Sequence, residues 1–94
     1  MRAKRRDANE VEIVRALRKM GMTVLLSDAV DLIIGYHGVN YLIEIKDKTT
    51  LKKDGKFKYG SLRPSQKKLL AEWRGQYHVV SSLDQILEII KCAI

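Results

Sequence analysis

Apolar and polar residues recur along this chain with two different periods, and these periods separate helices from strands. In residues 8–20 the apolar side chains are three or four positions apart, which predicts a helix that Gly21 ends. The positions that define this helical spacing are Ile13, Val14, Leu17 and Met20. We therefore expect the chain to begin its fold with an amphipathic helix.

Three strand patterns follow this helix. Residues 22–27 (MTVLLS) and 31–36 (DLIIGY) are mostly apolar runs, whereas residues 40–47 (NYLIEIKD) alternate between apolar and polar side chains. The link HGVN is short and contains Gly38, which is typical of a hairpin. We therefore expect the second and third strands to pair antiparallel.

The second half of the chain predicts two more helices with a strand between them. Pro64 suits the first position of a helix that Gly75 ends, and residues 77–80 (YHVV) suit a strand. Ser82, with Gln85 three positions later, is typical of a capping box before a last helix. The second helix shows one apolar face, and we expect its Trp73 in the core; the face consists of Leu69, Leu70 and Trp73. The predicted order is αβββαβα.

Composition limits the organisation and the partners of the protein. A chain of 94 residues that is 46% hydrophobic suits one domain, residues 1–94, and its formal charge of +7 suits a polyanion such as nucleic acid. The charge is concentrated in an N-terminal arm, residues 1–7, and in a loop, residues 48–62. The alternative is that the loop is only a solvated, solubilising segment. The residues expected to contact DNA phosphates are Arg5, Arg6, Lys48, Lys52, Lys53, Lys56, Lys58, Arg63 and Lys67.

Cysteine and apolar content indicate the compartment. Cys92 is the single cysteine, so no internal disulfide forms, and His37 and His78 have no companions for a structural zinc site. No run of 18 apolar residues is present. We expect a cytoplasmic protein without membrane segments.

Candidate chemistry lies in the third strand and its neighbour. Alternation places Glu44 and Lys46 on one face, and Asp31 opens the antiparallel strand beside them. Two nearby carboxylates repel each other unless a cation lies between them, and oxygen ligands favour Mg²⁺ or Mn²⁺ over zinc. The alternatives are an ion pair between Glu44 and Lys46 at a solvated strand end, and a turn role for Asp31.

Two further polar residues fall on faces that should be apolar. Glu10 lies among the core positions of the first helix, and Gln66 lies near the start of the second helix on its apolar face. Either could reach the candidate site. The alternatives are that Glu10 interacts with the dipole of its own helix, and that Gln66 caps its own helix at the third position.

These residues carry a resemblance to a known family. The segment DLIIGY, with EIK thirteen residues beyond Asp31, resembles the PD-(D/E)XK nucleases, and specifically the small stand-alone VRR-NUC proteins of phages. The resemblance spans nearly the whole chain, since Glu10 within RRDANE matches an early helical Glu and Gln66 matches a later Gln. The family usually has Pro before the strand Asp, where this chain has Val30.

The resemblance implies a restriction-endonuclease-like αβββαβ core with an added C-terminal helix, that is, a mixed central sheet flanked by helices. It also implies a divalent-metal-dependent DNA endonuclease, with branched, junction or flap DNA among its substrates, that forms homodimers and acts in the host cytoplasm where it is encoded by a phage. Two alternatives remain: a catalytically silent DNA-binding or assembly module with the same fold, and a small RNA-binding protein, although the chain lacks RNP-like and KH-type motifs.

A mechanism follows as a hypothesis. Asp31 and Glu44, with the Ile45 carbonyl and with Glu10 through a water, would hold Mg²⁺, for which Mn²⁺ would substitute. Lys46 would orient the attacking water or stabilise charge that grows on the phosphate. Gln66 would touch the substrate or order a water.

Overall fold

The computed structural model describes residues 8–46, 60 and 62–92, and its elements follow the order that the sequence predicts. Within these residues the fold is α/β, with three helices and one four-stranded mixed sheet. The elements are α1 (Ala8–Lys19), β1 (Thr23–Leu26), β2 (Leu32–Tyr36), β3 (Val39–Ile45), α2 (Pro64–Glu72), β4 (Tyr77–Val80) and α3 (Leu83–Cys92).

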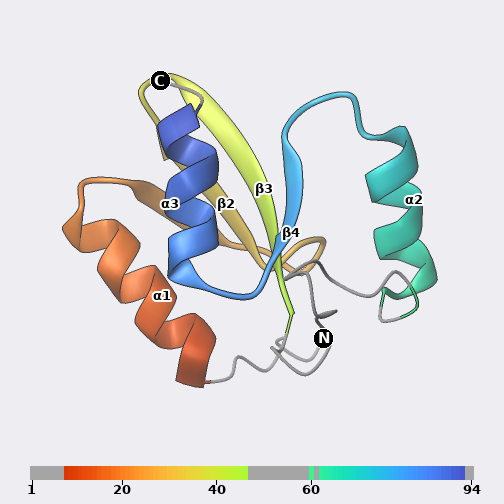
Figure 1. Cartoon of the computed structure of the whole chain (residues 1–94), viewed down its shortest axis with the longest axis horizontal. Coiled ribbons are helices and arrows are strands. Elements are labelled where there is room, and N and C mark those ends of the chain that lie inside the picture. Colours follow the sequence, from red (N-terminus) through yellow and green to blue (C-terminus); the bar gives the residue numbers. More distant parts are fainter. Residues whose placement is uncertain (1–7, 47–59, 61, 93–94) are drawn as a thin grey trace.

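The sheet has the strand order β1-β2-β3-β4. The first three strands pair antiparallel, as expected for β2 and β3, whereas β4 pairs parallel to β3. The connection from β3 to β4 contains α2, because parallel neighbours need a crossover rather than a tight turn. Figure 1 shows α1 and α3 together on one side of the sheet and α2 beyond β4, away from them.

The hydrophobic core lies between one face of the sheet and the helices α1 and α3. Strand alternation points every second side chain of β1, β2 and β3 toward these helices. Each fully buried aliphatic side chain contributes roughly 1.5 to 3 kcal/mol of transfer free energy. The core consists of Ile13, Val14, Leu17, Met22, Val24, Leu32, Ile34, Tyr41, Ile43, Val80, Ile86 and Ile90.

The hairpin between β2 and β3 is tighter than the sequence suggested. Tyr36 pairs with Val39, so the turn holds only two residues, and both have positive φ: 51° at His37 and 76° at Gly38. Positive φ at both central residues is the mark of the type I′ turn, whose twist matches that of the strands. The expected four-residue link is therefore wrong, since Val39 and Asn40 already belong to β3.

Three residues expected on apolar helix faces are exposed instead, and one of them is Leu70, which is 38% exposed. Helix α1 ends at Lys19, and Met20 follows it into an exposed turn that Gly21 completes at φ 91°. Helix α2 ends at Glu72, so Trp73 leaves the helical face and is 47% exposed. Its indole lies over Gly75, where an added Cβ would come within 3.0 Å of Trp73 Nε1. The expectation of a core tryptophan is therefore wrong.

Helix α3 begins with a capping box, as predicted, but one of its two hydrogen bonds has a different partner. The Ser82 hydroxyl accepts a hydrogen bond from the Gln85 N–H at 3.3 Å, as a capping box requires. The Gln85 side chain, however, accepts from the N–H of Ser81, at 2.6 Å, rather than from that of Ser82. The return bond of the box therefore falls one residue earlier than predicted.

Strand β1 forms one edge of the sheet, and α1 covers part of that edge. The Arg18 guanidinium donates a hydrogen bond to the Val24 carbonyl at 2.9 Å. An edge carbonyl that would otherwise face solvent is thereby satisfied by a side chain of the preceding helix. None of the described helices is both long enough and apolar enough to cross a membrane.

Candidate active site

Asp31 and Glu44 lie side by side at the end of the β2–β3 hairpin. Leu32 pairs with Ile43, so one further step along the antiparallel register sets Asp31 opposite Glu44. Both carboxyl side chains are buried, with 6% and 2% of their surface exposed. The hairpin thus concentrates two acidic groups in one enclosed place.

A hydrogen bond fixes the Asp31 carboxylate. The Ile45 N–H donates to Asp31 Oδ2 at 2.7 Å, a short distance that is typical of charge-assisted bonds. Strand β2 begins only at Leu32, so the side chain of Asp31 serves as the acceptor that a longer β2 would have provided. In an extended strand the N–H and C=O of one residue point to the same side, so the Ile45 carbonyl is expected to face Asp31 as well.

Burial singles out the residues that the sequence had marked. A buried polar group lowers stability unless it is bonded, so such groups need a structural or functional reason. Five residues were predicted to be catalytic, and four of them are among the buried polar or charged residues in the described part of the chain: Glu10, Asp31, Glu44 and Gln66. The other buried polar residue there is Ser81, which was not predicted.

Lys46 follows β3 directly and is partly buried. Its N–H donates to the Val80 carbonyl at 2.7 Å, so the pairing with β4 extends past the last strand residue. Because alternation continues with that pairing, Lys46 falls on the same face of the sheet as Glu44. That face is opposite to the one where Tyr41 and Ile43 enter the core.

Tyr77 belongs to the same face and was not foreseen from the sequence, which indicated only that a strand begins there. Tyr77 pairs with Leu42 in the parallel register of β3 and β4. Two residues further along, Val79 pairs with Glu44, so Tyr77 lies on the same face of the sheet as Glu44. Burial, followed by the charges of Glu44 and then Asp31, raises the pKa of Tyr77 to about 12. The phenol is therefore neutral at physiological pH. Its hydroxyl is buried and has no hydrogen-bond partner among the described residues.

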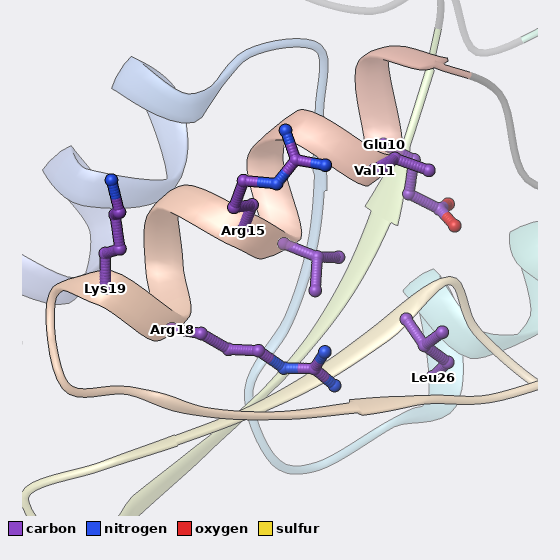
Figure 2. Close-up of a pocket in the computed structure, with 7 residues that line it drawn as sticks. Glu10, Val11, Arg15, Arg18, Lys19 and Leu26 are labelled. Atoms are coloured by element: carbon purple, nitrogen blue, oxygen red, sulfur yellow. The ribbon is translucent and has the colours of Figure 1, made fainter.

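Glu10 approaches from α1 and lines a pocket between this helix and β1. The pocket has a volume of about 550 Å³, and Figure 2 shows Glu10 at the end of the helix far from Lys19. Besides Glu10, it is lined by three apolar and three basic residues: Val11, Val14, Leu26, Arg15, Arg18 and Lys19. No three His, Cys, Asp or Glu residues within the described ranges form a group that could hold a metal ion. A contribution of Glu10 to the site, through a water, stays a prediction.

Gln66 adopts the structural role that was its alternative. Its Oε1 accepts the N–H of Arg63 at 2.9 Å, which caps the first turn of α2. The side chain is buried there. A contact between Gln66 and a substrate stays a prediction.

The predicted phosphate contacts are divided between described and other residues. Arg63 is exposed at the start of α2, and Lys67 on that helix is partly buried. The remaining seven lie outside the described residues: Arg5, Arg6, Lys48, Lys52, Lys53, Lys56 and Lys58.

The donor atoms at the hairpin end suit a hard divalent cation. Two carboxylates and a backbone carbonyl are the oxygen ligands that Mg²⁺ and Mn²⁺ prefer, and Mg²⁺ usually keeps several waters besides one or two carboxylates. The hydroxyl of Tyr77, which has no partner within residues 8–46, 60 and 62–92, adds a further oxygen that a bound water could satisfy. The residues present therefore fit such an ion. Comparison of the chain with protein-family models, with curated proteins and with solved structures returns no match.

Proposed function

We propose that this protein is a divalent-metal-dependent DNA endonuclease with Asp31, Glu44 and Lys46 at its active site. The observation that carries the proposal is the burial of two opposed carboxylates, Asp31 directly before β2 and Glu44 on β3, with Lys46 two residues after Glu44 on the same face. Water is a better solvent for such groups than a protein interior, so buried carboxylates are usually paired or coordinate a metal. A divalent cation bound between the two carboxylates would stabilise both charges.

The architecture supports the proposal. The observed order αβββαβα contains the αβββαβ order that the resemblance to PD-(D/E)XK nucleases implies, with one helix added at the C-terminus. The mixed sheet, in which β4 runs parallel to β3, is also what that resemblance implies. Val30, in the place of the usual proline, is buried and so holds the chain that leads into Asp31.

The mechanism assigns one task to each side chain. The hydrogen bond from Ile45 fixes Oδ2 of Asp31, which orients the rest of this carboxylate beside Glu44. Asp31, Glu44 and the Ile45 carbonyl would hold the ion, which, when bound, polarises a phosphate oxygen and lowers the pKa of a bound water. Lys46 would orient the attacking water or stabilise the negative charge that grows on phosphate oxygens. Glu10 would contribute through a water.

The sequence charge of +7 supports DNA as the partner, because Lys and Arg that neutralise phosphates supply affinity for any sequence. Branched, junction or flap DNA are the substrates to test first, as the resemblance implies. We further propose a homodimer in the cytoplasm. A single cysteine supports the reducing compartment, and sedimentation of the protein tests the dimer.

The deciding experiment compares cleavage by wild type and by three variants, Asp31→Asn, Glu44→Gln and Lys46→Ala. Supercoiled, linear, junction and flap DNA and RNA are each incubated with Mg²⁺, with Mn²⁺ and with EDTA. We expect cleavage only with metal, and a loss of at least about a hundredfold in each variant. The matched controls are Glu12→Gln and Lys91→Ala, which neutralise exposed charges on α1 and α3.

Full cleavage by all three variants would overturn the proposal. DNA binding without cleavage under every metal condition would instead support the catalytically silent module. Preferential binding or cleavage of RNA would support an RNA-directed protein.

A further inference from the structure

The starting point is the one buried side-chain oxygen or nitrogen that lacks a partner in the described part of the chain, the hydroxyl of Tyr77. Tyr77 is only 8% exposed, and a phenylalanine would fill the same space without burying a polar atom. Leaving a buried donor unsatisfied lowers stability, so native proteins rarely keep one without a reason. The hydroxyl therefore calls for a partner that the atoms of the described residues do not provide.

The register shows where this ligand would be. In β4, Tyr77 pairs with Leu42 and Val79 pairs with Glu44, so the phenol stands on the carboxylate face of the sheet. Asp31, directly before β2, lies opposite Glu44 on the same face. Burial, and after it the charges of Glu44 and Asp31, raises the pKa of Tyr77, which agrees with the placement that the strand register gives. The residue before β2 and residues of β3 and β4 thus each contribute one oxygen-bearing side chain.

We propose that Tyr77 is a positioning residue whose hydroxyl hydrogen-bonds a water bound to a divalent cation between Asp31 and Glu44. This inference rests on the proposed metal site, but it does not require that the protein cleave DNA. A phenol oxygen accepts a hydrogen bond from such a water, and its own proton is then free to turn toward a carboxylate oxygen. Mg²⁺ and Mn²⁺ are suitable ions because they retain water ligands.

Groups that hold the ligands of a metal affect its affinity strongly. Loss of such a contact typically weakens metal binding by about 10- to 100-fold. A hydroxyl with a purely structural role would have no such effect. The two roles of Tyr77 therefore make opposite predictions for one conservative substitution.

The test uses the full chain with Tyr77→Phe and Mn²⁺ as the probe. The dissociation constant for Mn²⁺ is measured from the free-ion electron paramagnetic resonance signal, and thermal unfolding is recorded in EDTA and across a Mn²⁺ titration. We expect Tyr77→Phe to melt at or above the wild-type temperature in EDTA, because it removes an unsatisfied polar atom. We also expect its Mn²⁺ dissociation constant to rise about tenfold or more.

The matched control is Tyr41→Phe, which removes the hydroxyl of a buried tyrosine that faces the core on β3. It should leave the Mn²⁺ affinity unchanged. If Tyr77→Phe binds Mn²⁺ as tightly as wild type, the inference about Tyr77 is wrong, while the proposed metal site is unaffected. A lower melting temperature of the same variant in EDTA would further indicate that the hydroxyl has a structural role. Absence of Mn²⁺ binding by the wild type would overturn the proposed metal site as well.

Discussion

Replacing Asp31 by alanine and, separately, by asparagine distinguishes its structural contribution from its proposed role at a cation. The Asp31 carboxylate accepts the Ile45 N–H at 2.7 Å in a buried position. Alanine removes this acceptor and leaves a buried amide without a partner. Asparagine keeps a carbonyl oxygen that accepts the same hydrogen bond, but it removes the negative charge that a cation needs.

The expected size follows from the bond that is lost. A hydrogen bond to a charged group stabilises a fold by about 1.5 to 3 kcal/mol. In a domain of this length each kcal/mol shifts the melting temperature by roughly 4 to 8 °C, so Asp31→Ala should melt about 6 to 24 °C below wild type in EDTA. Asp31→Asn should lose only a small part of this stability.

Thermal unfolding followed by circular dichroism, in EDTA and in excess MgCl₂, measures both effects. At a concentration 100 times the dissociation constant, a bound ion adds about 2.7 kcal/mol of stability, and we expect this gain in wild type only. Equal melting of the alanine and asparagine variants in EDTA would refute the role assigned to the hydrogen bond. A full Mg²⁺-dependent gain in Asp31→Asn would refute the role assigned to the charge.

Two further predictions concern stability. Leu17 is fully buried, so Leu17→Ala should lower the free energy of unfolding, measured by urea titration, by about 2 to 5 kcal/mol. Leu25 is 59% exposed, so Leu25→Ala should change it by less than about 0.5 kcal/mol. Similar losses in the two variants would contradict the assigned core. Burial lowers the pKa of His78 below its usual value of 6.5, so the unfolded chain binds a proton more readily and stability should fall as the pH drops through that value. The urea midpoint of unfolding should therefore change less between pH 7.5 and 5.5 in His78→Gln than in wild type. An equal change in the two proteins would argue against this role of His78.

Features set by local geometry could be predicted from the sequence. The period of two in β3 separates Glu44 from Ile43, and it requires no knowledge of distant residues. A short hairpin then aligns Asp31 with Glu44, even though the turn holds two residues rather than four. The error did not change the faces, because shortening the link by two residues shifts the register by two positions, and an even shift leaves every side chain on its own face.

Features set by contacts between distant segments could not be predicted. The position of Tyr77 on the carboxylate face depends on how β4 aligns with β3 after a crossover of about thirty residues, which no local pattern encodes. The exposure of Trp73 depends on where α2 stops, and helical spacing alone extends the apolar face past the true end. The role of Gln66 is a local matter by contrast: the sequence left two roles open, and the structure shows the cap.

The contact between Arg18 and the Val24 carbonyl bears on how the protein behaves at high concentration. An unprotected edge strand has unpaired backbone N–H and C=O groups that can pair with a strand of another molecule, which leads to aggregation. In this protein the Arg18 guanidinium already bonds one of these groups, the Val24 carbonyl. A strand of a second molecule would have to displace Arg18 before it could pair with β1, so this contact disfavours edge-to-edge association of two copies.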